Sequence, residues 1–297
     1  MAFQIFTDSS TDLSKELREK HNIKYFQMGI VVKGEGKPAD MDWKVYSPEE
    51  LYGWVKDLSN HCKTSLVTYG EYLEKTEAEL KQGKDVLYIA CTTALSGSLN
   101  TFRLVKEELQ EKYPNRKIVG IDGKRANMAL GLIVLHAAKL QEQGKDIEEV
   151  IKWINENQQY FHEVGSVETL TYLKAAGRVS GAAAFFGNLI SLKPIIMFDV
   201  HGYNYVFKKV RGSKAALEAS FEYIKENINE RTRVCYVGQA MAKDAQAYFK
   251  KRIEEELHIP VEEFWIGPIV GISCGPGMYG VFFEGKEVTV DSEASKK

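Results

Sequence analysis

The sequence lacks the features that mark nucleic-acid-binding proteins and metal-cluster proteins. Its 39 basic and 41 acidic side chains give a formal net charge of −2, and no basic stripe or arginine-rich tail is present. Proteins that bind nucleic acid or anionic membranes usually have a basic surface, so neither class is expected. The four cysteines, at positions 62, 91, 235 and 274, form no CxxC pair. We therefore expect a reducing compartment and no metal cluster.

Long apolar runs are missing as well. The longest, residues 182–192, is about half the length of a membrane-spanning helix and contains Asn188. The first residues, MAFQIFTDSS, have neither the basic segment nor the apolar core of a signal peptide. We expect a soluble, cytoplasmic protein without an integral membrane segment, for which any membrane contact is transient.

Motifs for nucleotide, metal or serine chemistry are absent or fail on their context. Residues 275–280 (GPGMYG) match GxGxxG, but a proline and a strand-like run follow where a dinucleotide site needs a helix. Residues 271–275 (GISCG) match GxSxG, but the last histidine, His258, lies upstream of Ser273 instead of downstream. The sequence contains no GxxxxGK[ST] or HExxH segment. No cofactor is therefore expected.

Short apolar runs alternate with helical patterns in the first half of the chain. Strands are predicted at residues 3–7, 86–90 and 117–122, and helical segments follow them. This alternation is typical of a parallel α/β sheet with crossover helices. A further strand is expected within residues 25–33, and the segment SPEE from Ser47 is a strong helix start.

The second half has a different pattern, which predicts a mixed sheet with helices on one face. His201-Gly202 is a hairpin signal between two apolar runs, and a short helix is expected within residues 168–176. The predicted strands lie at residues 163–167, 195–199, 203–208, 234–237 and 280–284.

A length of 297 residues corresponds to about two domains. We place the boundary near residue 160, after the polar run at residues 155–159. This gives an N-terminal parallel α/β domain (residues 1–160) and a C-terminal mixed-sheet α/β domain (residues 161–297). Because no Gly/Ser-rich linker occurs there, we expect the two domains to pack closely.

Hydroxyl side chains gather at four predicted junctions, at residues 7–12, 64–65, 91–101 and 271–277. Ligands of parallel sheets bind at the carboxyl ends of the strands, and three of the four junctions are expected at that edge. Taken singly, each hydroxyl is explained by helix capping, for which Ser, Thr and Asp are favoured.

The junction CTTALSGS contains more hydroxyl groups than a single helix cap requires. Thr92, Thr93, Ser96 and Ser98 surround Gly97, a residue that lets a backbone approach a ligand closely. Hydroxyls beside the free N–H groups of a helix start form a neutral anion site. Such a site suits a monoanion such as a carboxylate better than a triphosphate, which usually requires lysine and a metal ion.

Two further segments have both a structural and a functional interpretation. Residues 182–190 mix small side chains with Phe and Leu, which suits ordinary helix core or the wall of an apolar tunnel. Arg178 precedes them as an anion clamp or a structural ion-pair partner. Residues 208–214 (KKVRGSK) form a basic patch, either a solvated face or a surface for phosphate or a partner.

Together these segments resemble the DegV family of bacterial fatty acid-binding proteins. Residues 7–13 are similar to its opening TDSTADL, 63–65 to KTS and 95–98 to LSGT. Residues 170–179 resemble LEYLKKGGRI, and 266–277 resemble IGPVIGTHxGPG. Each motif is weak alone, but all five occur in order along nearly the whole chain.

The resemblance implies a two-domain α/β fold, with a three-layer N-terminal domain, that binds one long-chain fatty acid between its domains. It further implies that Thr64, Ser65 and Ser96 hold the carboxylate, with Gly97 offering its N–H. The family presents the fatty acid to a separate ATP-dependent fatty acid kinase, which makes acyl phosphate for phospholipid synthesis. The carrier subunit itself is not an enzyme.

The family motifs also assign arginines, and two positions depart from them. Arg178 and Arg211 match arginines expected near the carboxylate or at the kinase-docking face. Ser273 stands where the family usually has a histidine that touches the carboxylate or acyl phosphate. A serine there can bind the carboxylate but carries no charge at neutral pH, which bears on the kinase partnership. Gly123 stands where an Asp-Ser pair is common.

Burial of a lipid chain agrees with this interpretation. Each buried methylene contributes about 0.8 kcal/mol, so about 15 of them give roughly 12 kcal/mol before association costs. A neutral hydroxyl site then has only to orient the head group. The alternative is a stand-alone enzyme acting on a small phosphorylated or acylated substrate, favoured by the Asp8/Asp12 pair and the basic patch.

Overall fold

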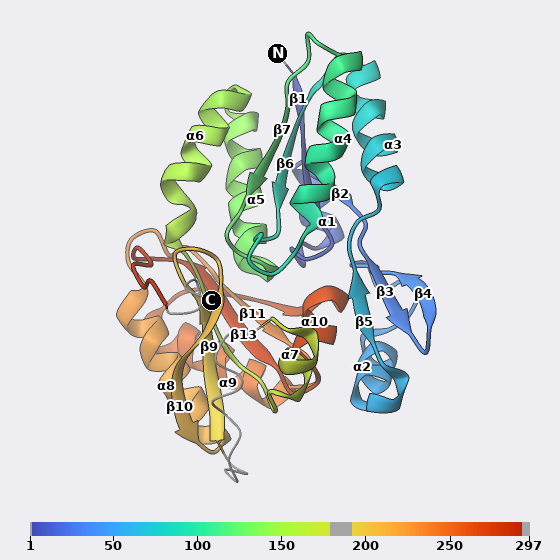
Figure 1. Cartoon of the computed structure of the whole chain (residues 1–297). Coiled ribbons are helices and arrows are strands. Elements are labelled where there is room, and N and C mark those ends of the chain that lie inside the picture. The colour runs from blue at the N-terminus through green and yellow to red at the C-terminus, as the bar shows by residue number, and fades with distance from the viewer. Residues whose placement is uncertain (1, 179–191, 293–297) are drawn as a thin grey trace.

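We analysed a computed structural model, which describes residues 2–178 and 192–292 (Figure 1). Its first half is built on a parallel sheet whose strands lie in the order β2-β1-β6-β7. The strands are β1 (Phe3–Asp8), β2 (Lys24–Phe26), β6 (Asp85–Ala90) and β7 (Ile118–Asp122).

Helices cover both faces of this sheet, because its central strands are apolar on both sides. In β6, Leu87 and Ile89 pack on one face while Val86 and Tyr88 pack on the other. Figure 1 shows the two helix layers on either side of the sheet, which confirms the predicted three-layer arrangement. One layer comprises α5 (Asn127–Glu142) and α6 (Ile147–Asn157), and the other α3 (Tyr69–Lys81) and α4 (Ser98–Lys112).

A small antiparallel sheet in the order β4-β3-β5 extends from the first half. The prediction of one strand within residues 25–33 was wrong, since β2 and β3 belong to different sheets. The chain leaves the parallel sheet at Met28, whose N–H donates to Ser9 Oγ at 3.0 Å. This part comprises β3 (Gly29–Val32), β4 (Glu35–Pro38), β5 (Lys63–Ser65) and α2 (Pro48–Lys56). Helix α1 (Lys15–Lys20) connects β1 to β2 of the parallel sheet.

The second half forms a six-stranded mixed sheet in the order β10-β9-β8-β13-β11-β12. The antiparallel pairing of β9 with β10 confirms the predicted hairpin, and a bulge interrupts it between Val206 and Lys208. Strand β12 pairs in parallel with β11 and was not predicted. The strands are β8 (Phe161–Ser166), β9 (Leu192–Phe198), β10 (Asn204–Arg211), β11 (Cys235–Gln239), β12 (Val261–Trp265) and β13 (Tyr279–Glu284).

Two long helices of the second half pack on one face of the mixed sheet, as predicted. They are α8 (Ser213–Asn227) and α9 (Lys243–Arg252), and Phe221 and Phe249 anchor them in one buried cluster. Two short helices lie toward the first half: α7 (Thr171–Ala176), which agrees with the prediction, and α10 (Pro268–Cys274), which was not predicted.

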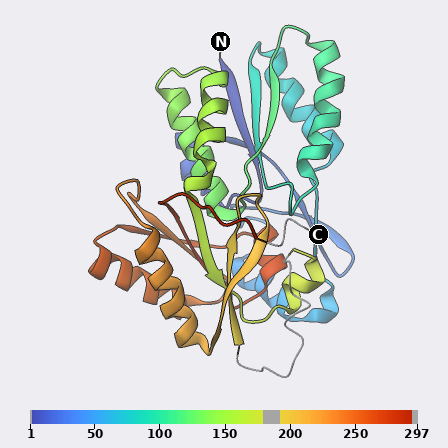
Figure 2. The ribbon, with the colours of Figure 1, turned by 60° about the vertical axis from the view of Figure 1, so that its left-hand side comes forward.

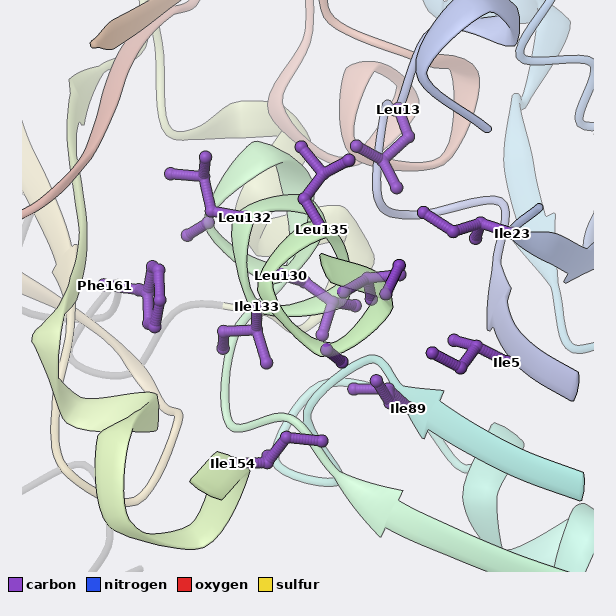
Figure 3. Packing of buried hydrophobic residues seen from close by; sticks show 14 of the residues in the cluster. Ile5, Leu13, Ile23, Ile89, Leu130, Leu132, Ile133, Leu135, Ile154 and Phe161 are labelled. Atoms are coloured by element: carbon purple, nitrogen blue, oxygen red, sulfur yellow. The ribbon is translucent and has the colours of Figure 1, made fainter. Parts of the chain in front are cut away.

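Helix α5 packs against both large sheets. It contacts β1 of the first half and β8 and β13 of the second. Figure 3 shows Leu130, Leu132 and Ile133 of α5 between Ile89 on one side and Phe161 on the other. Residues on all sides of this helix are therefore buried, which explains why its sequence is apolar all round.

The two halves thus share a buried core. Strands change from the parallel to the mixed sheet between β7 and β8, and the predicted boundary near residue 160 falls in this interval. The boundary itself remains a prediction, because α5 contacts both sheets. Figure 2 shows the green helices of this region reaching from the parallel sheet to the mixed sheet. Across the described residues, no helix has the length and apolar character to span a membrane.

Candidate functional site

A cavity of about 200 Å³ lies where the two halves meet. Segments far apart in the sequence form its wall: β5, the loop after β6, the start of α5, strand β8, the end of α7 and helix α10. Part of the wall is apolar and part carries hydroxyl groups. The apolar part includes Met28, Leu66, Leu95, Leu173, Phe198 and Ile269.

Five of the seven predicted site residues line this cavity. They are Thr64, Ser65, Ser96, Arg178 and Ser273. Their positions span more than two thirds of the chain, so the fold, and not local sequence, brings them together. Thr64 is half-buried and carries its hydroxyl on β5, which pairs with β3 in the small sheet.

The other two predicted residues lie outside the cavity wall. Gly97 is the residue before α4, and a Cβ placed on it would lie 3.4 Å from Leu66 Cδ1, an ordinary contact. Arg211 is exposed at the end of β10, in a separate groove with Lys208 and Lys214. Arg211 is not part of the cavity wall, and its role toward a partner or a phosphate group remains a prediction.

Within CTTALSGS, Ser96 is the hydroxyl residue that faces the cavity. Its Oγ accepts from the N–H of Ser98 at 3.2 Å and donates to Ser98 Oγ at 3.0 Å. Thr92 donates to the carbonyl of Gly202 at 3.1 Å and so joins the two halves, while Thr93 bonds Asp122. The structural interpretation therefore accounts for both threonines.

The loop after β1 was the first of the four hydroxyl junctions, and its aspartate Asp8 has a structural role. Asp8 Oδ1 accepts from the Ser10 hydroxyl at 2.6 Å, and Oδ2 accepts from Tyr88 OH at 2.7 Å and the Cys91 N–H at 3.0 Å. The buried carboxylate thus joins the ends of β1 and β6. Ser10 and Cys91 then face the cavity.

Only two of the four junctions lie at the carboxyl edge of the parallel sheet, those after β1 and β6; three were expected. Thr64 and Ser65 belong to β5, which is part of the small sheet. The segment GISCG begins within α10, which starts at Pro268. Proline is favoured in the first turn of a helix because its missing N–H would have no partner there.

The first half of the chain holds α10 in place. Asp12 Oδ2 accepts from the Gly267 N–H at 2.9 Å, and Tyr52 OH donates to the Ile266 carbonyl at 2.6 Å. Burial raises the pKa of Asp12 to about 8, against the lowering effect of the Gly267 bond. Ser273, on this helix, donates to the Ile269 carbonyl at 3.2 Å.

Arg178 brings a positive charge to the cavity wall. It follows Gly177, which ends α7 in the left-handed conformation with a φ of 66°. Arg178 Nε donates to the Leu95 carbonyl at 3.3 Å, and Nη1 donates to the Ala176 carbonyl. The proposed tunnel segment, residues 182–190, lies outside the described residues.

Glu163 and Asn127 are polar cavity residues that the sequence analysis did not single out. Glu163 of β8 is 8% exposed, and Asn127, the first residue of α5, is fully buried. Burial raises the pKa of Glu163 to about 8, with Arg125 opposing the shift and Asp12 adding to it. Neither residue belongs to a motif, although an acid within a predicted buried strand was a usable signal.

The described part of the chain contains no assembled catalytic group that would favour the stand-alone enzyme interpretation. Ser96 bonds Ser98, and Ser273 bonds a carbonyl, so within residues 2–178 and 192–292 neither serine is bonded to a histidine. The same residues contain no cluster of three or more His, Cys, Asp or Glu arranged to hold a metal ion.

The departure at Gly123 has a steric reason, since a Cβ there would lie 2.3 Å from Leu130 Cδ1.

Comparisons with known proteins agree with the sequence motifs. Residues 2–286 match the model of the protein family described as DegV. A DegV domain-containing protein of Clostridium perfringens is 31% identical over 287 residues, which cover 95% of this chain and 97% of the relative. A second protein of the same organism and description is 30% identical, with 95% and 99% covered.

Solved structures with the same fold include proteins described as fatty acid-binding. A stearic acid-binding protein of Eubacterium ventriosum is 25% identical with a TM-score of 0.85, covering 96% of this chain and 98% of its own. A DegV family protein of Thermus thermophilus, described by its fatty acid binding, is 25% identical with a TM-score of 0.84, covering 96% and 100%. This chain belongs to the DegV family.

Proposed function

We propose that this protein binds one long-chain fatty acid in the cavity between its two halves and acts as a carrier. The observation that carries the proposal is the convergence of Thr64, Ser65, Ser96, Arg178 and Ser273 on one cavity. The fatty acid binding described for the DegV family protein of Thermus thermophilus and for the structurally similar protein of Eubacterium ventriosum supports it.

The polar part of the wall suits a carboxylate. Thr64 and Ser96 supply hydroxyl donors, and Arg178 supplies the positive charge that a buried anion needs. Ser65 Oγ occupies the space over Gly29, where a Cβ would lie 2.3 Å from it. Gly29 therefore leaves the space that the Ser65 hydroxyl occupies.

The apolar part of the wall supplies the affinity. Leu66, Leu95, Leu173, Phe198 and Ile269 surround the start of an acyl chain, and burial of each methylene contributes about 0.8 kcal/mol. The hydroxyl groups then orient the head group and contribute less to affinity than the chain does.

The first experiment is denaturing extraction of the purified protein followed by mass spectrometry of the lipids. We expect one fatty acid per chain. A protein that is purified without lipid and also refuses added stearic acid in a binding titration contradicts the proposal.

A matched pair of variants at Thr64 tests the carboxylate site. Thr64→Val keeps the shape of the side chain and removes the hydroxyl, whereas Thr64→Ser keeps the hydroxyl. We expect the Val variant to bind stearic acid roughly tenfold more weakly, since a donor to a charged group contributes about 1.5–3 kcal/mol, and the Ser variant to bind nearly as the parent does. Equal affinities in both variants would remove Thr64 from the site.

The carrier role extends to presentation of the fatty acid to a separate ATP-dependent fatty acid kinase, which forms the acyl phosphate. Arg211, Lys208 and Lys214 in the groove between β10 and α8 are the candidate contact for such a partner. Alone, the loaded protein should neither bind ATP with magnesium nor hydrolyse it. With the kinase, ATP turnover should depend on the loaded carrier.

Charge reversal separates the docking surface from the binding site. Arg211→Glu should lower kinase-dependent turnover without changing fatty acid affinity, while Lys251→Glu on α9, an equal charge change outside the groove, should leave both unchanged. Micromolar ATP binding by the protein alone would contradict the carrier role.

A further inference from the structure

Two polar side chains on the cavity wall are left without a partner inside the described protein. Asn127 is fully buried, and its Nδ2 has no hydrogen-bond partner, while its Oδ1 accepts from the Met128 N–H at 2.8 Å. Glu163 is 8% exposed, and within residues 2–178 and 192–292 no group forms a hydrogen bond or ion pair with its carboxyl group. Buried polar groups are normally satisfied, so the Asn127 amide lacks an acceptor within the described residues, while the Glu163 side chain lines the cavity.

The two side chains come from elements that pack against each other. Helix α5 contacts β8, and Figure 3 shows Phe161 of β8 against Leu132 and Ile133 of α5. Side chains alternate along a strand, so Glu163 points to the same face of the sheet as Phe161, toward α5. Asn127 opens α5, and Ala126 directly before it also lines the cavity.

The nearby buried arginine does not satisfy Glu163. Arg125 donates to the carbonyls of Phe161 at 2.7 Å, Lys124 at 2.7 Å and Asp199 at 3.2 Å, and to Gln159 Oε1 at 3.0 Å. Its N–H groups are thus used by oxygens other than a carboxylate. Glu163 therefore faces the cavity as an acid without a cation bonded to it.

We propose that the bound fatty acid carries a hydroxyl group close to its carboxyl end, which accepts from Asn127 Nδ2 and donates to Glu163. This inference rests on the proposed function. A hydroxyl is the group that both accepts from an amide and donates to a carboxyl oxygen, whereas a ketone cannot donate. The pairing also holds for either protonation state of Glu163.

The position of the hydroxyl follows from the size of the cavity. Asn127 and Glu163 line the same 200 Å³ space as Thr64 and Ser96, which are proposed to hold the carboxylate. The second oxygen of the ligand therefore lies within a few carbons of the first. Ligands of this class are the 2-hydroxy and 3-hydroxy fatty acids.

The test compares four probes by competition titration: stearic acid, its 2-hydroxy and 3-hydroxy derivatives, and a stearic acid hydroxylated in mid-chain. We expect the full-length protein to bind the 2-hydroxy or the 3-hydroxy acid at least about tenfold more tightly than stearic acid, a difference of about 1.4 kcal/mol. The mid-chain derivative should bind no better than stearic acid.

Variants assign the preference to the two residues. Glu163→Leu should abolish it and bind stearic acid at least as well as the parent does. Asn127→Asp keeps the acceptor for the Met128 N–H and tolerates the φ of 54°, but it removes the amide donor, so it too should lose the preference. Glu262→Gln, an exposed acid on β12 of the same sheet, is the control that should keep it.

The outcomes separate this inference from the proposed function. A protein that binds stearic acid as tightly as both hydroxylated acids overturns the hydroxyl site and leaves the carrier role standing. A protein that binds none of the four acids overturns both. If Glu163→Leu does not fold, Asn127→Asp still decides, because a preference kept in that folded variant also overturns the inference.

Discussion

Ser96 and Ser98 are bonded neighbours with different surroundings. Ser98 is fully buried in the first turn of α4, whereas Ser96 is half-buried on the cavity wall. The hydroxyl of Ser96 both accepts from Ser98 and donates to it. A carboxylate that enters the cavity can take over the donated proton, because a charged acceptor forms the stronger hydrogen bond.

Removal of that hydroxyl should weaken ligand retention. We expect Ser96→Ala to raise the dissociation constant for stearic acid by roughly tenfold, since a bond to a charged group contributes about 1.5–3 kcal/mol. Ser96→Thr should retain most of the affinity. Thr93→Ala, in the same loop but off the cavity wall, is the control, and an equal loss in that variant would point to loop disruption instead.

The two acids with raised pKa values make the stability of the protein depend on pH. Burial raises the pKa of Glu163 from 4.5 to about 8 and that of Asp12 from 3.8 to about 8. Between about pH 5 and pH 8 the folded protein therefore holds protons that the unfolded chain has released. These two groups should therefore make stability fall as pH rises through this window. His162, whose pKa burial lowers from 6.5 to about 4, acts in the opposite direction below about pH 6.5.

Glu163→Gln should remove part of that loss. Between about pH 5 and pH 8, the free energy of unfolding should fall by at least about 2 kcal/mol less in the variant than in the parent. The reason is that one pKa unit corresponds to about 1.4 kcal/mol. Urea titrations at both pH values measure the difference. Identical pH profiles for parent and variant would mean that Glu163 is ionised in the fold through a partner.

At the scale of elements, α10 is the wall of the cavity that the first half holds in place. Tyr52 OH donates to the Ile266 carbonyl just before the helix, at a site that is almost fully buried. Tyr52→Phe leaves that carbonyl without its donor, which should cost about 1–3 kcal/mol of stability. Tyr69→Phe, at an exposed tyrosine that bonds Glu108, should cost less than about 0.5 kcal/mol.

The Tyr52 variant should also release its fatty acid faster, because Ser273 and Ile269 on α10 line the cavity. Stopped-flow transfer of the ligand to an acceptor protein measures that rate. A destabilised variant with an unchanged release rate would show that the position of α10 does not control retention.

Elements with strong local signals were predictable, and elements defined by distant contacts were not. The strand at 86–90 and the helix after Ser47 follow from apolar runs and a capping box, in which Ser47 and Glu50 bond each other's N–H groups. Helix α10 has only seven residues, and its start depends on Asp12 and Tyr52, more than two hundred residues away.

The cavity residues also divide into those that local motifs revealed and those that distant contacts place. Motifs that resemble those of the family located Thr64, Ser65, Ser96 and Arg178, and Ser273 was located as the departure from the histidine of its motif. The structure adds that all five line one space. Glu163 and Asn127 have no motif. Their place in the cavity depends on how α5 packs on β8, which no local pattern of residues encodes.

At the scale of the whole molecule, α5 and Arg125 join the two halves. Arg125 is fully buried, and its N–H groups reach carbonyls of Lys124 in the first half and of Phe161 and Asp199 in the second. Leu132 and Ile133 of α5 pack in the core that also contains Phe161. The halves should therefore unfold together, although their sheets are separate.

A single cooperative transition is the expected outcome of chemical denaturation. Circular dichroism and tryptophan fluorescence should give the same midpoint, and Arg125→Met should lower it for both probes because four oxygens lose their donor. Two separated transitions would show that each half is stable alone.

The open edges of the mixed sheet bear on how the protein behaves at high concentration. Strand β10 ends the sheet on one side with a bulge after Val206 and the exposed Lys208, and β12 ends it on the other with exposed Glu262 and Glu263. Charges and bulges at sheet edges oppose pairing with the same edge of another molecule. Sheet ends of opposite charge, however, attract each other in low salt. Storage of the protein at moderate ionic strength should therefore prevent head-to-tail growth of sheets between molecules.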